Sequence, residues 1–227
     1  MNGFLGRLII LLAYCGYGFA APPTVRSLSA NKDVPLDTNT ASPFWRAAVP
    51  VYMDGDAYGH PVPKYRTEVR LRWTKKNLYV LFVCPYEQLN LNPNPKTSTE
   101  TYELWDWDVA EIFIGADFKD IKRYKEFEVS PQGEWIDLDI DLHKSHHEEG
   151  WTWNSGFQVS ARIERDAHVW YAAMKIPYSR STRVRPPPGT FYGSICFAAR
   201  ARNQAGMKSR GRLRWQTLFM CRSDLAC

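Results

Sequence analysis

The chain has 227 residues, of which 44% are hydrophobic and 14% aromatic. This composition is typical of a packed globular domain, and it excludes a disordered chain and a coiled coil. The 29 lysines and arginines exceed the 24 aspartates and glutamates by five (29 − 24). So small an imbalance does not hold a polyanion at physiological salt, and no nucleic-acid partner is expected. Nine tryptophans are more than a core of this size needs, so some of them are expected to face solvent.

The first twenty residues have the pattern of a secretory signal peptide. Arg7 precedes an apolar stretch over residues 8–19, and small residues lead to a cleavage site near Ala20. We therefore expect a secreted or periplasmic protein. No stretch of the chain is apolar for long enough to span a bilayer, so no transmembrane segment is expected. A lipoprotein is the less favoured alternative, because Tyr14 is too large for the position before Cys15.

Alternation of apolar and polar residues dominates the rest of the chain and predicts β-strands. Turn residues at 75–77 and 131–133 indicate two hairpins. Strands are predicted at 69–73, 78–83, 109–114, 126–129, 136–142, 157–164, 169–176, 191–201 and 212–218. This pattern predicts an all-β fold, an antiparallel β-sandwich of about eight to ten strands with jelly-roll or immunoglobulin-like layering. No linker divides residues 21–227, so they are predicted to form a single domain and a monomer.

An exported chain would bring its cysteines into an oxidising compartment, where four thiols allow three pairings. Cys84 and Cys196 lie inside apolar runs and are interpreted as buried thiols. Cys221 and Cys227 lie in a polar tail, where they could pair locally or stay free.

The stretch 102–111 is the most informative about function. In an extended chain Trp105 and Trp107 would project to one side, and Glu111 would continue that side into the next strand. Indole rings beside carboxylates suit sugars, because a pyranose has an apolar C–H face and a rim of hydroxyls. The alternative is that these rings only pack over a sheet edge.

Trp135 shares a strand face with Asp137, Asp139 and Asp141. The aspartates could line a polar groove or hold Ca²⁺, but a solvated outer face is the favoured interpretation. The stretch 143–149 contains three histidines and two glutamates without a zinc-site spacing, and we interpret it as a solvated loop. An alternating basic series between residues 200 and 214 is likewise expected to be solvated, with Arg202 a candidate for contact with ligand hydroxyls.

Several blocks of the sequence, taken in order, resemble the family 9 carbohydrate-binding modules. They are Leu78-Tyr-Val80, Trp105-Asp-Trp-Asp-Val-Ala-Glu-Ile-Phe-Ile114, Phe127-Glu-Val-Ser-Pro131 and Met174-Lys-Ile-Pro177. The resemblance runs from about residue 37 to 215 and implies a β-sandwich that binds sugars without catalysis, with structural calcium in some members and no other cofactor.

By this resemblance Trp105 stacks on the sugar and Glu111 binds its hydroxyls. Glu128 falls where the family can carry an arginine. The family continues to a second stacking tryptophan after the segment that ends near Trp215, so the last segment is expected to be truncated. The other wall could be supplied by one of three rings: Trp107, Trp151 or Trp153. The full set of candidate sugar-binding residues is Trp105, Trp107, Glu111, Glu128, Trp135 and Arg202.

The sequence thus predicts an exported, non-catalytic protein that binds oligosaccharides or polysaccharide chain ends and takes part in polysaccharide breakdown. One alternative is an electron-transfer sandwich that holds haem between His168 and Met174, although residues six apart on one strand could hardly reach both faces of a haem. Another is a glycoside hydrolase with a carboxylate pair. Among 24 acidic residues such a pair has little specificity, so catalysis stays open and binding is preferred.

Overall fold

The computed structural model describes residues 27–55, 60–115, 120 and 122–178, together with the backbone of 192–200 and 219–222. The strands are β1 (Leu28–Ser29), β2 (Val51–Met53), β3 (Thr67–Trp73), β4 (Asn77–Pro85), β5 (Val109–Gly115), β6 (Arg123–Val129), β7 (Trp135–Asp141), β8 (Gln158–Glu164), β9 (Val169–Pro177), β10 (Tyr192–Arg200) and β11 (Phe219–Arg222). The helical segments are α1 (Pro43–Arg46) and three 3₁₀ turns, η1 (Pro63–Tyr65), η2 (Leu104–Asp106) and η3 (His147–Thr152). No helix in the described ranges is long and apolar enough to cross a membrane.

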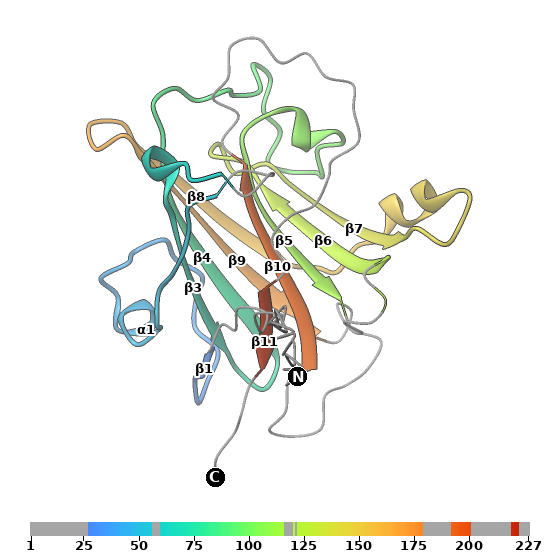
Figure 1. Cartoon of the computed structure of the whole chain (residues 1–227), viewed down its shortest axis with the longest axis horizontal. Helices are drawn as coiled ribbons and strands as arrows, with labels where there is room; N and C mark the ends of the chain where they lie inside the picture. The colour runs from blue at the N-terminus through green and yellow to red at the C-terminus, as the bar shows by residue number, and fades with distance from the viewer. Residues whose placement is uncertain are drawn as a thin grey trace, which may run out of the picture.

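The strands form two sheets that lie face to face (Figure 1). One sheet has the order β1-β3-β4-β9-β8, with β2 also paired to β3, and the other has the order β11-β10-β5-β6-β7. All strand pairs are antiparallel except β1 with β3. The predicted β-sandwich is therefore confirmed, as are the hairpins β3–β4 and β6–β7. The strand predicted at 212–218 lies outside the described residues.

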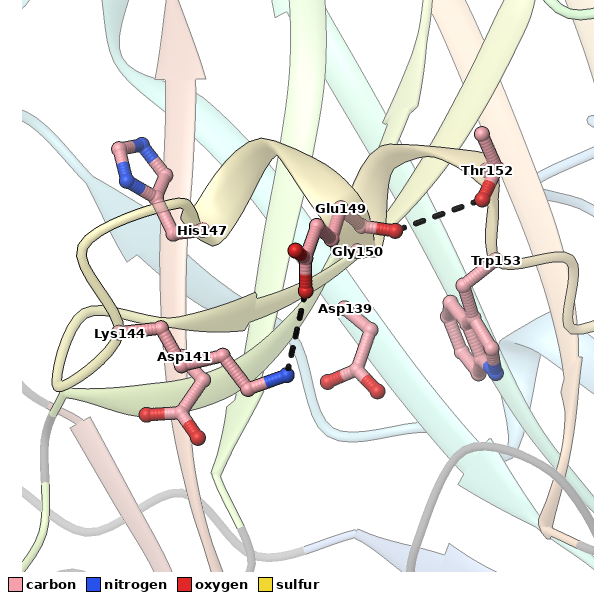
Figure 2. A pocket seen from close by; sticks show the side chains of 8 residues that line it. All are labelled: Asp139, Asp141, Lys144, His147, Glu149, Gly150, Thr152 and Trp153. Atoms are coloured by element: carbon pink, nitrogen blue, oxygen red, sulfur yellow. Dashed lines mark hydrogen bonds and ion pairs between the residues drawn. The ribbon is translucent and has the colours of Figure 1, made fainter.

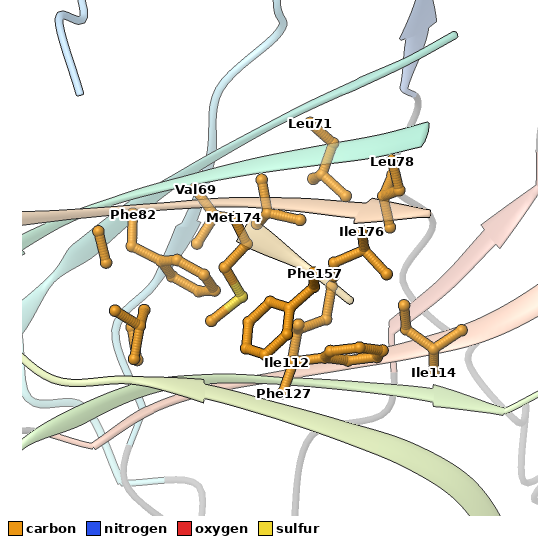
Figure 3. Close-up of a cluster of buried hydrophobic side chains, with 14 of the residues drawn as sticks. Val69, Leu71, Leu78, Phe82, Ile112, Ile114, Phe127, Phe157, Met174 and Ile176 are labelled. Atoms are coloured by element: carbon orange, nitrogen blue, oxygen red, sulfur yellow. The ribbon is translucent and has the colours of Figure 1, made fainter. Parts of the chain in front are cut away.

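The main core fills the space between the sheets. Figure 3 shows Val69 and Phe82 from one sheet, Met174 from the same sheet, and Ile112 and Phe127 from the other, converging on a common centre. Their side chains are completely buried, and each such side chain contributes about 1.5–3 kcal/mol through the loss of water-exposed apolar area. The predicted burial of Cys84 is confirmed, and its thiol is free.

The outer face of the six-stranded sheet carries a second apolar cluster. Ser42 caps α1 by accepting a hydrogen bond from the Trp45 N–H at 3.4 Å, and Pro43 follows at the first helical position, which favours a helix start. Trp45 is 1% exposed, packs on this face with Tyr79 and Leu81, and donates its indole N–H to the Asp37 carbonyl at 3.0 Å. The segment around α1 therefore covers this cluster with the chain itself.

The outer face of the five-stranded sheet carries a third apolar cluster, formed by Leu104, Val109, Ile136, Leu138 and Ile140. Trp105 from η2 and Trp151 from η3 pack against it. The register explains which residues of β7 face outward: Ile136 lies opposite Glu128 on β6, whereas Trp135 lies opposite the core residue Val129. The two faces of this edge strand are thus both largely covered.

Candidate functional site

The turn η2 positions Trp105 at the outer face of the five-stranded sheet. Leu104 is fully buried and anchors the turn, and Glu103 precedes it with a left-handed backbone, φ 58°. A non-glycine residue in that region costs about 1 kcal/mol, so the tight turn must be held by its surroundings. Asp108 helps to hold it, because its carboxylate accepts the Asn90 N–H at 2.8 Å. The extended conformation assumed for residues 105–107 is wrong, so their alternation does not place Trp107 beside Trp105.

Three rings gather at this point, and we call Tyr102, Trp105 and Trp151 the outer aromatic cluster. Their centroids are 5.6 Å apart for Tyr102–Trp105, 5.2 Å for Tyr102–Trp151 and 5.9 Å for Trp105–Trp151. The two tryptophans meet edge to face at 63°, so they do not form a parallel sandwich. Tyr102 is 52% exposed and both indoles are half-buried. The cluster therefore offers a partly open aromatic surface.

Three carboxylates share the outer face of the sheet. Glu111 on β5 lies directly opposite Glu128 on β6. Glu126 lies two residues before Glu128 on the same strand. Directly opposed side chains have Cβ atoms about 4.5–5.5 Å apart. All three are buried, with exposures of 3% for Glu111, 8% for Glu126 and 0% for Glu128. The two acids expected to bind sugar hydroxyls, Glu111 and Glu128, are therefore buried rather than open to solvent.

Burial controls the protonation of this acidic face. It raises the pKa of Glu126 to about 7, and a side-chain hydrogen bond with Glu128 acts in the opposite direction. Burial also raises the pKa of Tyr124 above its ordinary value, and the negative charges of Glu126 and Glu111 add to this effect. A buried carboxyl that holds its proton near neutral pH can donate a hydrogen bond as well as accept one.

The remaining candidate residues lie elsewhere. Trp107 is half-buried at the end of η2. Trp135 points to the inner side of its sheet, where its ring meets Phe157 at 5.8 Å and 90°. Arg202 lies outside the described residues. Of the rings considered for the second wall, Trp151 reaches Trp105, whereas Trp153 lies on the inner side against Phe127 at 6.1 Å.

The aspartates of β7 do not form a solvated outer face, so that interpretation is wrong. Asp137 is fully buried on the inner side of the sheet, and its carboxylate accepts the Ser155 N–H at 2.7 Å. Glu100 lies beside it, and burial together with its hydrogen bond to Asp137 raises the pKa of Glu100 to about 7. The side of β7 that carries the aspartates is covered because residues 150–157 fold back along the edge strand.

An open pocket of about 260 Å³ lies between β7 and η3 (Figure 2). We call it the η3 pocket, and it is lined by Asp139, Asp141, Lys144, His147, Glu149, Gly150, Thr152 and Trp153. Gly150 allows η3 to lie this close to β7, since a Cβ there would stand 1.7 Å from the Asp139 carbonyl oxygen. Most of 143–149 is exposed, as predicted.

The residues of the other two hypotheses are placed as follows. Met174 is completely buried in the main core, while His168 lies in the turn between β8 and β9 with its ring 5.3 Å from Tyr86. Such a methionine offers no open position for a haem. Of the acidic candidates, Glu111 and Glu128 lie opposite each other on β5 and β6, and both are buried. Within the described ranges no three acidic, histidine or cysteine side chains group together as metal ligands.

Comparison with solved structures finds sandwiches similar to this one. A carbohydrate-binding module family 9 protein of Caldicellulosiruptor kristjanssonii in complex with cellotriose is 13% identical, with a TM-score of 0.49, and the match covers 76% of this chain and 74% of that one. A carbohydrate-binding module family 9 protein of the same organism in complex with glucose gives a TM-score of 0.48 at 13% identity, covering 76% of both chains. Both belong to the family that the sequence resembles.

A protein of Bacteroides uniformis ATCC 8492, provisionally described as carbohydrate-binding, gives a TM-score of 0.59 at 11% identity. That match covers 88% of this chain and all of the other. No family model matches the sequence, and no curated protein does. At such identities the similarity establishes the fold, and the function has to be argued from the site.

Two features of the site were not found from the sequence. Tyr102 was not singled out, although it lies three residues before Trp105, and the η3 pocket was not anticipated. Its lining joins β7 to a turn that follows it, and the only sequence signals were the charged stretch 143–149 and the glycine between Glu149 and Trp151.

Proposed function

We propose that this protein is a non-catalytic carbohydrate-binding protein whose sugar site is the outer aromatic cluster. The observation that carries the proposal is the partly exposed contact of Tyr102, Trp105 and Trp151 on one face of a β-sandwich. The C–H face of a pyranose is apolar and packs against such rings, whereas its hydroxyls need polar partners.

The polar partners are supplied around the cluster. The phenol of Tyr102 is half-exposed, and Glu103 and Asp106, which flank Trp105, are exposed as well. The indole N–H of Trp151 is buried without a hydrogen-bond partner among the described residues. A buried donor left unpaired costs about 1–3 kcal/mol. The buried acids Glu111 and Glu128 lie on the same outer face of the sheet.

The finer features of the proposal follow the sequence. We propose that the protein is exported by its leader and acts in polysaccharide breakdown, because a binding protein without a catalytic centre serves to hold a glycan near enzymes. The similar modules seen with cellotriose and glucose suggest β-glucan oligosaccharides as the first ligands to try.

Calorimetric titration of the protein with glucose, cellotriose and xylotriose tests this function. Binding of at least one trisaccharide is expected, with a negative heat-capacity change from burial of apolar surface. Absence of heat with all three, confirmed by a lack of retention on immobilised cellulose and xylan, would overturn the proposal.

A further inference from the structure

The η3 pocket lies next to the outer aromatic cluster but on the other side of η3. His147 borders both: it lines the pocket, and its ring centroid is 6.0 Å from that of Trp151. Residue 151 sends its ring to the outer cluster, and Trp153, two residues later, sends its ring into the pocket. One short turn therefore joins two surfaces that each contain an indole.

The groups in the pocket are those that bind hydroxyls. Figure 2 shows the carboxylates of Asp139, Asp141 and Glu149 gathered between η3 and β7, with the Trp153 ring at one end. Glu149 pairs with Lys144 at 3.9 Å, and its carbonyl accepts the Thr152 hydroxyl at 3.4 Å. Carboxylates, an ammonium group and a hydroxyl beside an indole provide acceptors, donors and an apolar surface together.

The charges of the pocket are balanced. Asp139 pairs with Lys125, Asp141 pairs with Arg123 at 3.2 Å, and Glu149 pairs with Lys144. Burial acts to raise the pKa of Asp141, but hydrogen bonds from the His143 N–H and from Arg123 outweigh it and lower this pKa. The Asp141 carboxylate is therefore ionised at neutral pH. A site with paired charges has no net preference for an ion and suits a neutral, hydroxyl-rich ligand.

We propose that the η3 pocket is a second carbohydrate subsite, which takes one pyranose unit of a glycan whose neighbouring part stacks on the outer aromatic cluster. This inference rests on the proposed function and extends it from a single sugar site to a chain of at least two units. The volume of about 260 Å³ is below the range of drug-sized pockets, about 300–1,000 Å³, and so suits a single small ring.

The test follows the indole N–H signals of the full-length protein by NMR, assigned with single Trp→Phe variants, during titration with glucose, cellotriose and xylotriose. A trisaccharide is expected to shift the signals of Trp105, Trp151 and Trp153. Glu149→Gln is expected to weaken trisaccharide binding about tenfold, because a hydrogen bond to a charged acceptor is lost. Glu87→Gln is the matched control, since Glu87 also pairs with a surface lysine but does not line the pocket.

Each other outcome decides a different point. Shifts of Trp105 and Trp151 without Trp153, or unchanged affinity in Glu149→Gln, would overturn the subsite and leave the proposed function intact. A shift of Trp153 alone would show that no glycan bridges the two surfaces. Unchanged indole N–H signals of all three tryptophans with every sugar would overturn the proposed function and the subsite together.

Discussion

The outer faces of the two sheets are both covered by aromatic residues, yet they are covered differently. On the six-stranded sheet Trp45 is 1% exposed and its indole N–H is bonded to a backbone carbonyl. On the five-stranded sheet Trp105 and Trp151 stay half-buried, Tyr102 is 52% exposed, and the indole N–H of Trp151 lacks a partner among the described residues. On the first face the Trp45 ring is covered by the chain itself, whereas on the second the three rings stay partly open.

The charged groups show the same difference. Arg72 donates to the carbonyl oxygens of Leu28 and Phe44 at 3.0 and 2.9 Å, so its donors are used within the fold. On the other sheet three buried carboxylates share one face, and the pKa of one of them, Glu126, is raised to about 7. Buried groups with strongly shifted pKa values are concentrated at functional sites more often than elsewhere. The comparison therefore agrees with the proposal that one face is structural and the other binds a ligand.

The largest effect is expected from Trp45→Ala. Removing a fully buried indole from the closed face should lower the free energy of unfolding by about 3–5 kcal/mol. The fraction that remains folded should bind the trisaccharide with unchanged affinity, because Trp45 is remote from the outer aromatic cluster. Urea denaturation and calorimetry measure the two quantities, and a loss of affinity in the folded protein would break the comparison.

Trp105→Ala should have the opposite effect, with a large loss of sugar affinity and a smaller loss of stability. Loss of a central aromatic anchor should weaken sugar binding by about 2–3 kcal/mol, roughly 30- to 150-fold. Stability should fall by less than in Trp45→Ala, since Trp105 is only half-buried. Calorimetry on both variants under the same conditions compares them, and wild-type affinity in Trp105→Ala would remove the cluster from the site.

The acidic face should make stability depend on pH. Because folding raises the pKa of Glu126 from its ordinary value of 4.5 to about 7, the folded state holds more protons between those values. The free energy of unfolding should therefore fall as the pH rises from about 4.5 to 7, and level off above that. Glu126→Gln should reduce the fall between pH 5 and pH 8 by about 1–3 kcal/mol.

Urea denaturation at several pH values measures this slope. Glu164→Gln, which changes an exposed carboxylate on β8, serves as the control. Glu100 contributes a fall of the same sign, so part of the slope should survive in Glu126→Gln. Identical slopes in wild type and Glu126→Gln would show that Glu126 is ionised in the folded protein throughout this range.

The smallest effect is expected from replacing an exposed tyrosine, and two such tyrosines can be compared. Tyr102 is 52% exposed in the outer aromatic cluster, and Tyr52 is 41% exposed beside Arg66 in the other sheet. Tyr102→Ala should weaken trisaccharide binding by about 1 kcal/mol, roughly fivefold, through lost aromatic contact. Tyr52→Ala should not change it. Equal effects of the two changes in calorimetry would mean that neither ring is specific to the site.

The sequence predicted the strands well because their alternation is local. Residues 69–73 and 78–83 carry the pattern themselves, and β3 and β4 extend it by a few residues at most. The short strands β1 and β2 were missed, since two or three residues contain too little of the pattern to be detected.

The direction in which a strand faces was harder to predict. The alternation in β7 separates Ile136 from Asp137 but does not say which set faces the other sheet. Because this edge strand is covered on both sides, the aspartates turned inward, where Ser155 and Lys125 meet them. The candidate site could be predicted only in part for the same reason: Trp105 stands out within its own stretch, whereas the meeting of Tyr102 with Trp151 depends on tertiary contacts.

A crystal structure of the protein with a bound trisaccharide tests the central claim most directly. The comparison of the two faces predicts a pyranose ring in van der Waals contact with Trp105 and Tyr102, at the outer face of the five-stranded sheet. A trisaccharide bound instead at the outer face of the six-stranded sheet, near Trp45 and Tyr52, would contradict it.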